Sequence, residues 1–331
     1  MKLSILDQSP ISDGKTPREA LETSIKLAQL GDEFGYHRYW IAEHHDLFGL
    51  ASPNPAVMLG VIGSHTERIR IGAGAVLLPY YKPFRVAETY NLLQTLFPGR
   101  IDLGLGRAPG GSAEVSLALS DNYLKQVNEY PKQIEELLGF LHGSFPKDHP
   151  YGKISPTPVP ETPPETWLLG TSGKSAILAA EKGLNYSFGH FMTDFDGPEI
   201  VKTYRENFSE NHGASGHVIV AITVICAETS EEAEELALSN FLWKIHQDKM
   251  LENQAVPSVA DAKKYAFTDE EEEKIEKMKR KMIIGDPAQV KAEIEALNEK
   301  YAADEMMIVT ITHDEEAKFT SYCLLAEAFG L

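Results

Sequence analysis

Short apolar runs alternate with longer amphipathic stretches along almost the whole chain. The apolar runs are rich in Ile, Val, Leu and Ala, which is typical of buried strands. The stretches between them carry apolar residues three and four positions apart, which predicts helices. The predicted strands cover residues 3–6, 39–42, 69–78, 100–106, 167–170, 184–188, 218–227 and 306–311.

Local signals at the helix starts support this division. Thr16, Pro17 and Glu19 combine an N-cap residue, a proline for the first helical position and a capping-box acid. Asn54-Pro55 opens a second helix in the same way, and Thr229 precedes a further one. The sequence therefore predicts a helix after nearly every strand.

Eight strands that alternate with helices indicate parallel βα units. Closing eight such units gives a (β/α)8 TIM barrel, and apolar strands suit a sheet that is covered on both faces. An open, doubly wound α/β sheet is the alternative. A chain of 331 residues suits one barrel, so we expect residues 1–331 to form a single domain with insertions.

Residues 251–284 interrupt the regular alternation and predict an insertion between strands seven and eight. Thr268 and Glu271 resemble a capping box that leads into the charged run 270–281. The simpler interpretation is a solvated helix held by Glu/Lys pairs. The functional interpretation is a lid over the barrel mouth.

Composition excludes several classes of partner. The net charge of −18 argues against nucleic acid and against an anionic membrane surface. Cys226 and Cys323 both lie in apolar runs, which predicts buried, reduced thiols. We find no export signal and no apolar stretch long enough to span a bilayer, so we expect a cytoplasmic protein.

Three familiar motifs are incomplete. The run 173–175 reads Gly-Lys-Ser, but a phosphate-binding P-loop would need glycine where Leu168 stands. The run 104–106 reads Gly-Leu-Gly, but a dinucleotide fingerprint would need glycine where Pro109 stands. His44-His45 lies at a strand end, where adjacent side chains point to opposite faces, so we expect no metal site.

Four polar or glycine-rich segments lie at the carboxyl ends of predicted strands, where barrel enzymes place their active sites. They are residues 43–45, 72–75, 106–107 and 170–175. A guanidinium at Arg107 can grip a phosphate, and the helix start at Ser172 can bind an anion through hydroxyl and backbone donors. The alternatives are a structural ion pair for Arg107 and ordinary helix capping for the serines.

The longer motifs make the resemblance specific. They are Trp40-Ile41-Ala42-Glu43-His44-His45, then Gly-Ala-Gly-Ala-Val-Leu-Leu-Pro from Gly72, and Gly-Arg-Ile-Asp-Leu-Gly-Leu-Gly-Arg ending at Arg107. In this order they resemble the bacterial luciferase-like family of flavin-dependent monooxygenases. The resemblance covers nearly the whole chain; it is strongest from strand two to strand four and weak after about residue 200.

The resemblance implies an FMN site at the barrel mouth. His44 matches the family's catalytic histidine, and His45 beside it is expected to be structural. The cofactor contacts carried over are Arg107, Ser172 and Ser175 to the phosphate, Thr171 and Gly173 through backbone, and Ala73, Gly74 and Ala75 as the floor under the ring, with Gly74-Ala75 as a candidate cis peptide. Phe188, His190 and Phe191 are candidates for the other side of the ring, and Phe48, Tyr80 and Tyr81 for the substrate side or for the core.

The resemblance also implies the reaction. Reduced FMN, as a co-substrate, and dioxygen would insert one oxygen atom into a small organic substrate, such as an aldehyde or another carbonyl compound. His44 would act as acid or base, unless it is a structural histidine. The alternatives are a deazaflavin-dependent oxidoreductase on the same fold and a non-catalytic flavin-binding protein. A separate flavin reductase and a homodimer are the expected protein partners.

Overall fold

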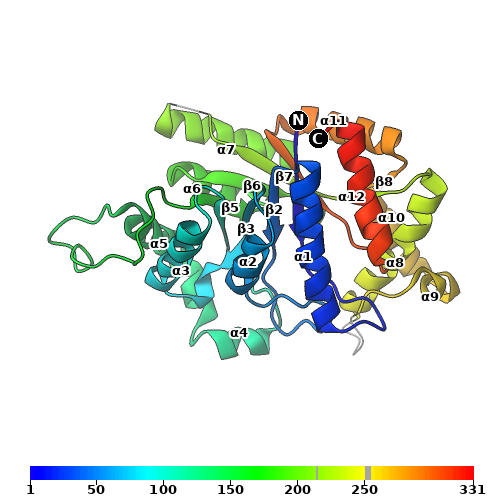
Figure 1. Ribbon diagram of the computed structural model, residues 1–331, viewed down its shortest axis with the longest axis horizontal. Coiled ribbons are helices and arrows are strands. Elements are labelled where there is room, and N and C mark those ends of the chain that lie inside the picture. Colours follow the sequence, from blue (N-terminus) through cyan, green and yellow to red (C-terminus); the bar gives the residue numbers. More distant parts are fainter. Residues whose placement is uncertain (214, 250–254) are drawn as a thin grey trace.

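The computed structural model describes residues 1–213, 215–249 and 255–331. The elements of these ranges alternate as the sequence predicts (Figure 1). The strands are β1 (Lys2–Asp7), β2 (Arg38–Ile41), β3 (Arg70–Leu77), β4 (Ile101–Gly106), β5 (Glu165–Gly170), β6 (Asn185–Gly189), β7 (Val218–Cys226), β8 (Met282–Gly285) and β9 (Glu305–Val309). The helices are α1 (Pro17–Phe34), α2 (Pro55–Ser64), α3 (Pro83–Leu96), α4 (Ala113–Leu119), α5 (Tyr123–His142), α6 (Gly173–Glu181), α7 (Gly197–His212), α8 (Ser230–Asp248), α9 (Val259–Lys264), α10 (Asp269–Lys279), α11 (Pro287–Tyr301) and α12 (Glu315–Phe329), with the 3-10 turns η1 (Leu78–Tyr80) and η2 (His190–Met192).

The sheet closes on itself. Its strands follow the order β6-β5-β4-β3-β2-β1-β9-β7-β8, every pairing is parallel, and an additional pairing joins β6 to β7. The prediction of a (β/α)8 barrel is therefore confirmed, and the open sheet is wrong. Both termini lie at the end of the barrel opposite α4 and α9 (Figure 1).

Strand β8 was not predicted. The first part of β7 pairs with β6 from Val218 to Ala221, and its last part pairs with β8 from Thr223 to Cys226. Strand β8 thus extends the barrel wall beyond the point where β6 has ended. It closes the predicted insertion, whose residues 255–284 also hold α9 and α10, whereas residues 251–254 lie outside the described part of the chain.

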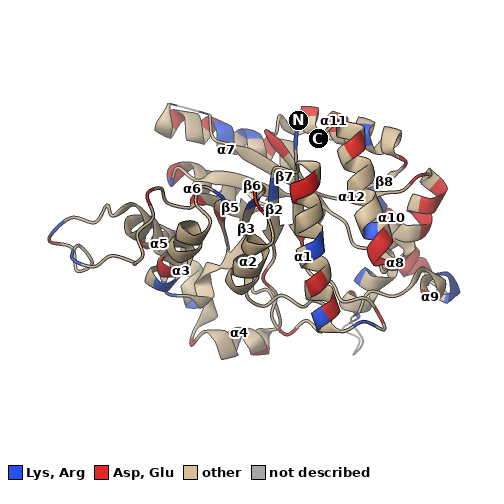
Figure 2. Cartoon of the chain, viewed as in Figure 1, with Lys and Arg blue, Asp and Glu red and all other residues tan. Residues whose placement is uncertain are grey.

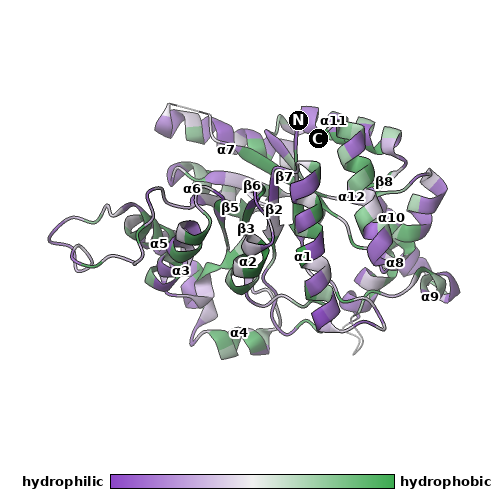
Figure 3. Ribbon diagram, viewed as in Figure 1, coloured by the Kyte–Doolittle hydropathy of each residue, from purple (hydrophilic) through white to green (hydrophobic). Residues whose placement is uncertain are grey.

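Apolar side chains fill two layers. The larger core lies between the sheet and the helices, whose apolar faces Figure 3 shows as green bands along α1, α2 and α12. The smaller core fills the barrel around Leu6, Trp40, Trp167 and Met307. Strand side chains alternate between the two faces of a sheet, so the strands supply both layers.

A buried ionic network closes the barrel at its amino-terminal end. The Arg38 guanidinium donates to Asp102 at 2.9 Å and to Glu305 at 3.1 Å, and all three side chains are almost fully buried. Burial would raise the pKa of Glu305, but its polar neighbours, Arg38 among them, outweigh burial and lower that pKa to about 2. The network fills the amino-terminal end of the barrel, so the space for ligands lies at the carboxyl-terminal end.

The outer helices carry the acidic surface, with red acidic segments on α1, α8 and α10 in Figure 2. In the ranges that the structure describes, we find no helix that is both long and apolar enough to cross a bilayer.

Candidate active site

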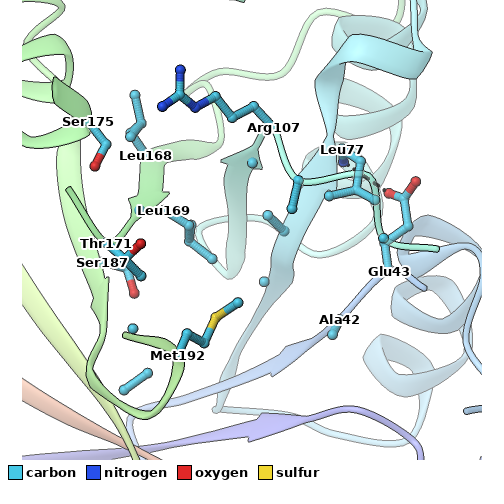
Figure 4. Close-up of a pocket in the computed structure, with 18 of the residues that line it drawn as sticks. Ala42, Glu43, Leu77, Arg107, Leu168, Leu169, Thr171, Ser175, Ser187 and Met192 are labelled. Atoms are coloured by element: carbon cyan, nitrogen blue, oxygen red, sulfur yellow. Dashed lines mark hydrogen bonds between the residues drawn. The ribbon is translucent and has the colours of Figure 1, made fainter. Parts of the chain in front are cut away.

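A cavity of about 390 Å³ opens at the carboxyl ends of the strands, and we call it the central cavity (Figure 4). It brings together segments that follow β2, β3, β4 and β5. Most of the predicted site residues line it: His44, Gly74, Ala75, Arg107, Thr171, Ser172 and Ser175. The loops after β4 and β5 therefore share one cavity, as a common ligand requires.

Ala73 and Gly173 do not line the central cavity. Ala73 is fully buried in the core between sheet and helices, because it is turned to the opposite face of β3 from Gly74. Gly173 is the first residue of α6, one position before the lining residue Lys174. A contribution of Ala73 to the floor and a backbone contact of Gly173 therefore stay predictions.

The floor of the cavity contains the small residues Gly74 and Ala75 of β3, and Leu77 lines the cavity farther along the same strand. The Gly74–Ala75 peptide bond is cis, as the resemblance implied. A Cβ atom at Gly74 would come within 2.9 Å of Leu6 Cδ1, and one at Gly104 within 2.2 Å of the Ala73 carbonyl oxygen. Glycine at these two positions therefore lets neighbouring strands approach closely and keeps the floor flat.

Arg107 supplies a positive charge at the mouth. Its side chain is exposed and extends toward the Ser175 side of the cavity in Figure 4. No carboxylate in the described ranges forms an ion pair with it, so the structural ion pair considered from the sequence is absent there. The guanidinium is thus available to an anionic ligand.

Tyr130 of α5 adds a polar group to the same wall. Its ring is 2% exposed and it lines the central cavity, but its hydroxyl has no hydrogen-bond partner in the described structure. A buried hydroxyl without a partner costs free energy, about 1–3 kcal/mol, unless a ligand or water satisfies it. Tyr130 is therefore a polar group that a bound ligand can complete.

The start of α6 forms the opposite wall. Ser172 and Ser175 make a reciprocal capping box, and the Ser175 hydroxyl also lies 3.0 Å from the Tyr186 hydroxyl. The serines thus do the capping that the simpler interpretation assigned to them. The capping box uses the N–H groups of Ser172 and Ser175, and the first N–H groups of a helix have no partner within it. The helix start keeps backbone donors and a positive dipole end for an anion.

Glu43 is a buried anchor beneath the mouth. It accepts hydrogen bonds from the Tyr81 hydroxyl and from a ring nitrogen of His45, both at 2.8 Å, and from the Leu77 N–H at 3.2 Å. The structure thus gives His45 the positioning role that was expected of it. Tyr81 is held away from the cavity wall, and Tyr80 is held likewise by a bond to the Pro109 carbonyl.

His44 lies between two spaces. It lines the central cavity and a second one, and its Nδ1 is buried without a hydrogen-bond partner in the described structure. Burial, followed by the charges of Lys244 and His45, lowers the pKa of His44 to about 4. The imidazole is therefore neutral at pH 7, which suits a proton acceptor or a hydrogen-bond partner and does not suit a cationic acid.

The second space, which we call the outer cavity, has a volume of about 820 Å³. Helices α8 and α10 and the start of β8 form much of its wall, and it shares Gln8, His44, Phe191 and Met192 with the central cavity. Of the aromatic residues considered from the sequence, Phe48 and Phe191 line it. Phe188 packs on Tyr301 and His190 bonds the hydroxyl of the same tyrosine, so neither reaches a cavity wall.

Comparison with known proteins shows the family of the chain. The profile of the luciferase-like monooxygenase family matches residues 1–304. This chain belongs to that family. The present chain is 45% identical to the uncharacterized Bacillus subtilis protein YceB, with 99% of both chains covered. It is 37% identical to the N-acetyl-S-alkylcysteine monooxygenase of the same organism, over 99% of this chain and 98% of the other. Among solved structures, apo-MsnO8 superposes with a TM-score of 0.87 at 32% identity, covering 100% of this chain and 98% of the other.

Several residues of this luciferase-like monooxygenase were missed from the sequence. Tyr130, Lys174 and Met192 line the central cavity, and Lys244 lines the outer one. Tyr130 and Lys244 lie in the middle of ordinary helical patterns, so only the packing of α5 and α8 shows which way they face. Within the described ranges, no group of three His, Cys, Asp or Glu residues lies close enough to hold a metal ion.

Proposed function

We propose that the protein is an FMN-dependent monooxygenase that uses reduced FMN and dioxygen to oxidise a small organic substrate. The carrying observation is that one cavity is bordered by a guanidinium without an ion-pair partner in the described ranges, by a helix start and by small residues at Gly74 and Ala75. In a chain with a net charge of −18, such a local positive site is best explained by an anionic ligand.

The residues present fit this cofactor. Arg107 and the start of α6, with Ser172, Ser175 and the backbone of Thr171, would hold the phosphate. Tyr130 would donate its free hydroxyl to a ligand oxygen. Gly74 and Ala75 would lie under the flavin ring. Bound FMN supplies the electron transfer to dioxygen, and the protein orients the substrate and excludes water.

His44 would serve the reaction from between the two cavities. Its neutral imidazole can accept a proton from the substrate or hold a hydrogen bond to it. The low pKa keeps the ring uncharged across the neutral range. His44 lines both cavities, so it would lie against a flavin ring in the central cavity and a substrate in the outer one.

Related proteins support the assignment. The oxygenating constituent of 3,6-diketocamphane monooxygenase, solved with FMN, has the same fold with a TM-score of 0.73 at 21% identity. The N-acetyl-S-alkylcysteine monooxygenase bears the name of a reaction on a small organic compound. A trigonelline monooxygenase, 23% identical over 225 residues, is named as an oxygenase component, which favours a separate flavin reductase for this protein too.

The alternative, a deazaflavin-dependent oxidoreductase, also occurs on this fold. An alcohol dehydrogenase that uses the deazaflavin F420 superposes with a TM-score of 0.69 at 14% identity. Titrating the purified protein with FMN and with F420 separates the two, and we expect FMN to bind more tightly. Tighter binding of F420 would replace the proposed cofactor.

The activity test uses chemically reduced FMN, ¹⁸O₂ and panels of small aldehydes, ketones and thioethers. We expect mass spectrometry to find one ¹⁸O atom in a product and no turnover without reduced flavin. Tight FMN binding with no oxygenated product from any panel would favour a flavin-binding protein without this activity.

We also propose a homodimer in the cytoplasm. Helices α2 and α3 expose Val57, Val61, Leu92 and Leu96, which are 37–64% exposed. Exposed apolar side chains on adjacent helices are typical of an association surface. Light scattering after size-exclusion chromatography measures the mass, and a monomer at micromolar concentration would contradict this part of the proposal.

A further inference from the structure

Lys244 has an unusual setting for a lysine. It projects from α8 into the outer cavity, where its side chain is half-buried. Its Nζ lies 3.3 Å from the Gln247 amide oxygen and 4.6 Å from the centre of the Trp243 ring. No carboxylate in the described ranges lies within ion-pair distance. By contrast, Lys318 is buried and has Asp7 at 3.0 Å.

An amide oxygen and a ring face compensate a half-buried ammonium only in part. Burial lowers the pKa of Lys244, and the more distant Asp248 opposes that shift. The charge is thus poorly solvated and would be stabilised by an anion that enters the cavity. The acidic residues that line the same cavity do not neutralise Lys244, because Asp46 is exposed and Asp194 is paired with Lys281 at 2.5 Å.

The rest of the outer cavity suits the body of an organic molecule. Leu47, Phe48, Leu50 and Met278 contribute apolar surface to its wall. His44 stands at the boundary with the central cavity, and the Lys244 charge acts on it. A molecule held at Lys244 therefore lies beside His44 and the proposed flavin site.

We propose that the substrate is an organic acid with an apolar arm, and that Lys244 binds its carboxylate in the outer cavity. This deepens the proposed function and rests on it for the identity of the ligand as substrate. The carboxylate fixes one end of the molecule, and the apolar arm reaches past His44 toward the flavin side. Lys244 is accordingly a specificity-determining residue.

Calorimetric titration of the FMN-loaded protein tests this with matched pairs of compounds. The probes are N-acetyl-S-ethylcysteine and hexanoate, each compared with its primary amide. We expect at least one acid to bind about tenfold or more tightly than its amide, the scale of one charge-assisted hydrogen bond. In Lys244→Met, the affinity for that acid should fall to the affinity for its amide.

Lys202→Met is the control, because Lys202 is exposed on α7 and pairs only with Glu199. It should keep the full preference for the acid. Lys244→Arg retains the charge and should keep most of the preference for the acid. If Lys244→Met fails to fold, Lys244→Arg is measured in its place, and we expect Lys244→Arg not to lose the preference. An acid preference that persists in Lys244→Met, or no acid that binds more tightly than its amide, would overturn the proposal.

FMN titration of the same samples separates this inference from the proposed function. Failure to bind FMN, with the acid preference intact, would remove the flavin proposal and leave Lys244 as an anion site. Normal FMN binding without an acid preference would remove the Lys244 proposal and leave the flavin proposal in place.

Discussion

Replacing Arg107 with alanine isolates one charge at the proposed phosphate site. The residue is exposed and has no ion-pair partner in the described ranges, so its removal leaves no buried acid behind. A charge-assisted hydrogen bond contributes about 1.5–3 kcal/mol. We therefore expect FMN to bind about 10- to 150-fold more weakly. Because the site is open to solvent, the loss should shrink at high salt.

Riboflavin, which lacks the phosphate, is the matched ligand for this experiment. Quenching of flavin fluorescence gives both affinities for the natural protein and for Arg107→Ala. We expect the affinity for riboflavin to be unchanged. The whole loss of binding free energy should then appear as a smaller difference between the affinities for FMN and for riboflavin. Unchanged FMN affinity would remove Arg107 from the site. An equal loss for both ligands would show that the substitution disturbs the fold and not a phosphate contact.

Three further predictions concern other parts of the molecule. His44→Ala should keep FMN affinity and slow oxygenation, and normal turnover would make His44 structural. Gly104→Ala should unfold at a denaturant midpoint well below that of the natural protein and bind FMN more weakly, because its Cβ would lie 2.2 Å from the Ala73 oxygen; unchanged stability and binding would contradict this. Glu305, with a folded pKa of about 2 against an ordinary value of 4.5, should contribute stability, about 3 kcal/mol, that is complete above pH 5 and lost as the pH falls from 4.5 toward 2. The stability difference between the natural protein and Glu305→Gln, from denaturant midpoints, should then shrink over that interval, and a constant difference would refute the assignment.

The barrel was predictable because its signals are local. Pro17 and Pro55 both stand at the first position of a helix, as the sequence indicates. Strand β8 was missed because its apolar run, residues 282–284, is very short and follows a charged helix. Its pairing partner β7 lies more than fifty residues earlier in the chain, and no local pattern reports such a contact.

The site was predictable only where position along a strand decides it. Arg107 and Ser172 follow strand ends, and parallel strands bring those ends to one rim. The orientation of Ala73 could not be predicted, because a run of small residues does not say which of its members faces inward. Tyr130 and Lys244 could not be found, since each is one position in a long helix whose rotation depends on tertiary packing.

The division of the mouth into two cavities separates chemistry from selectivity along the chain. Residues up to Met192 form almost all of the central cavity, whereas α8, α10 and β8 form much of the outer one. Because β8 is hydrogen-bonded to β7, the outer wall is built onto the barrel itself. Changes in α8, α10 and β8 can therefore alter part of the outer cavity while the lining of the central cavity stays the same. Exchange of residues 230–285 between two members of the family would transfer preference for a compound without rebuilding the cofactor site.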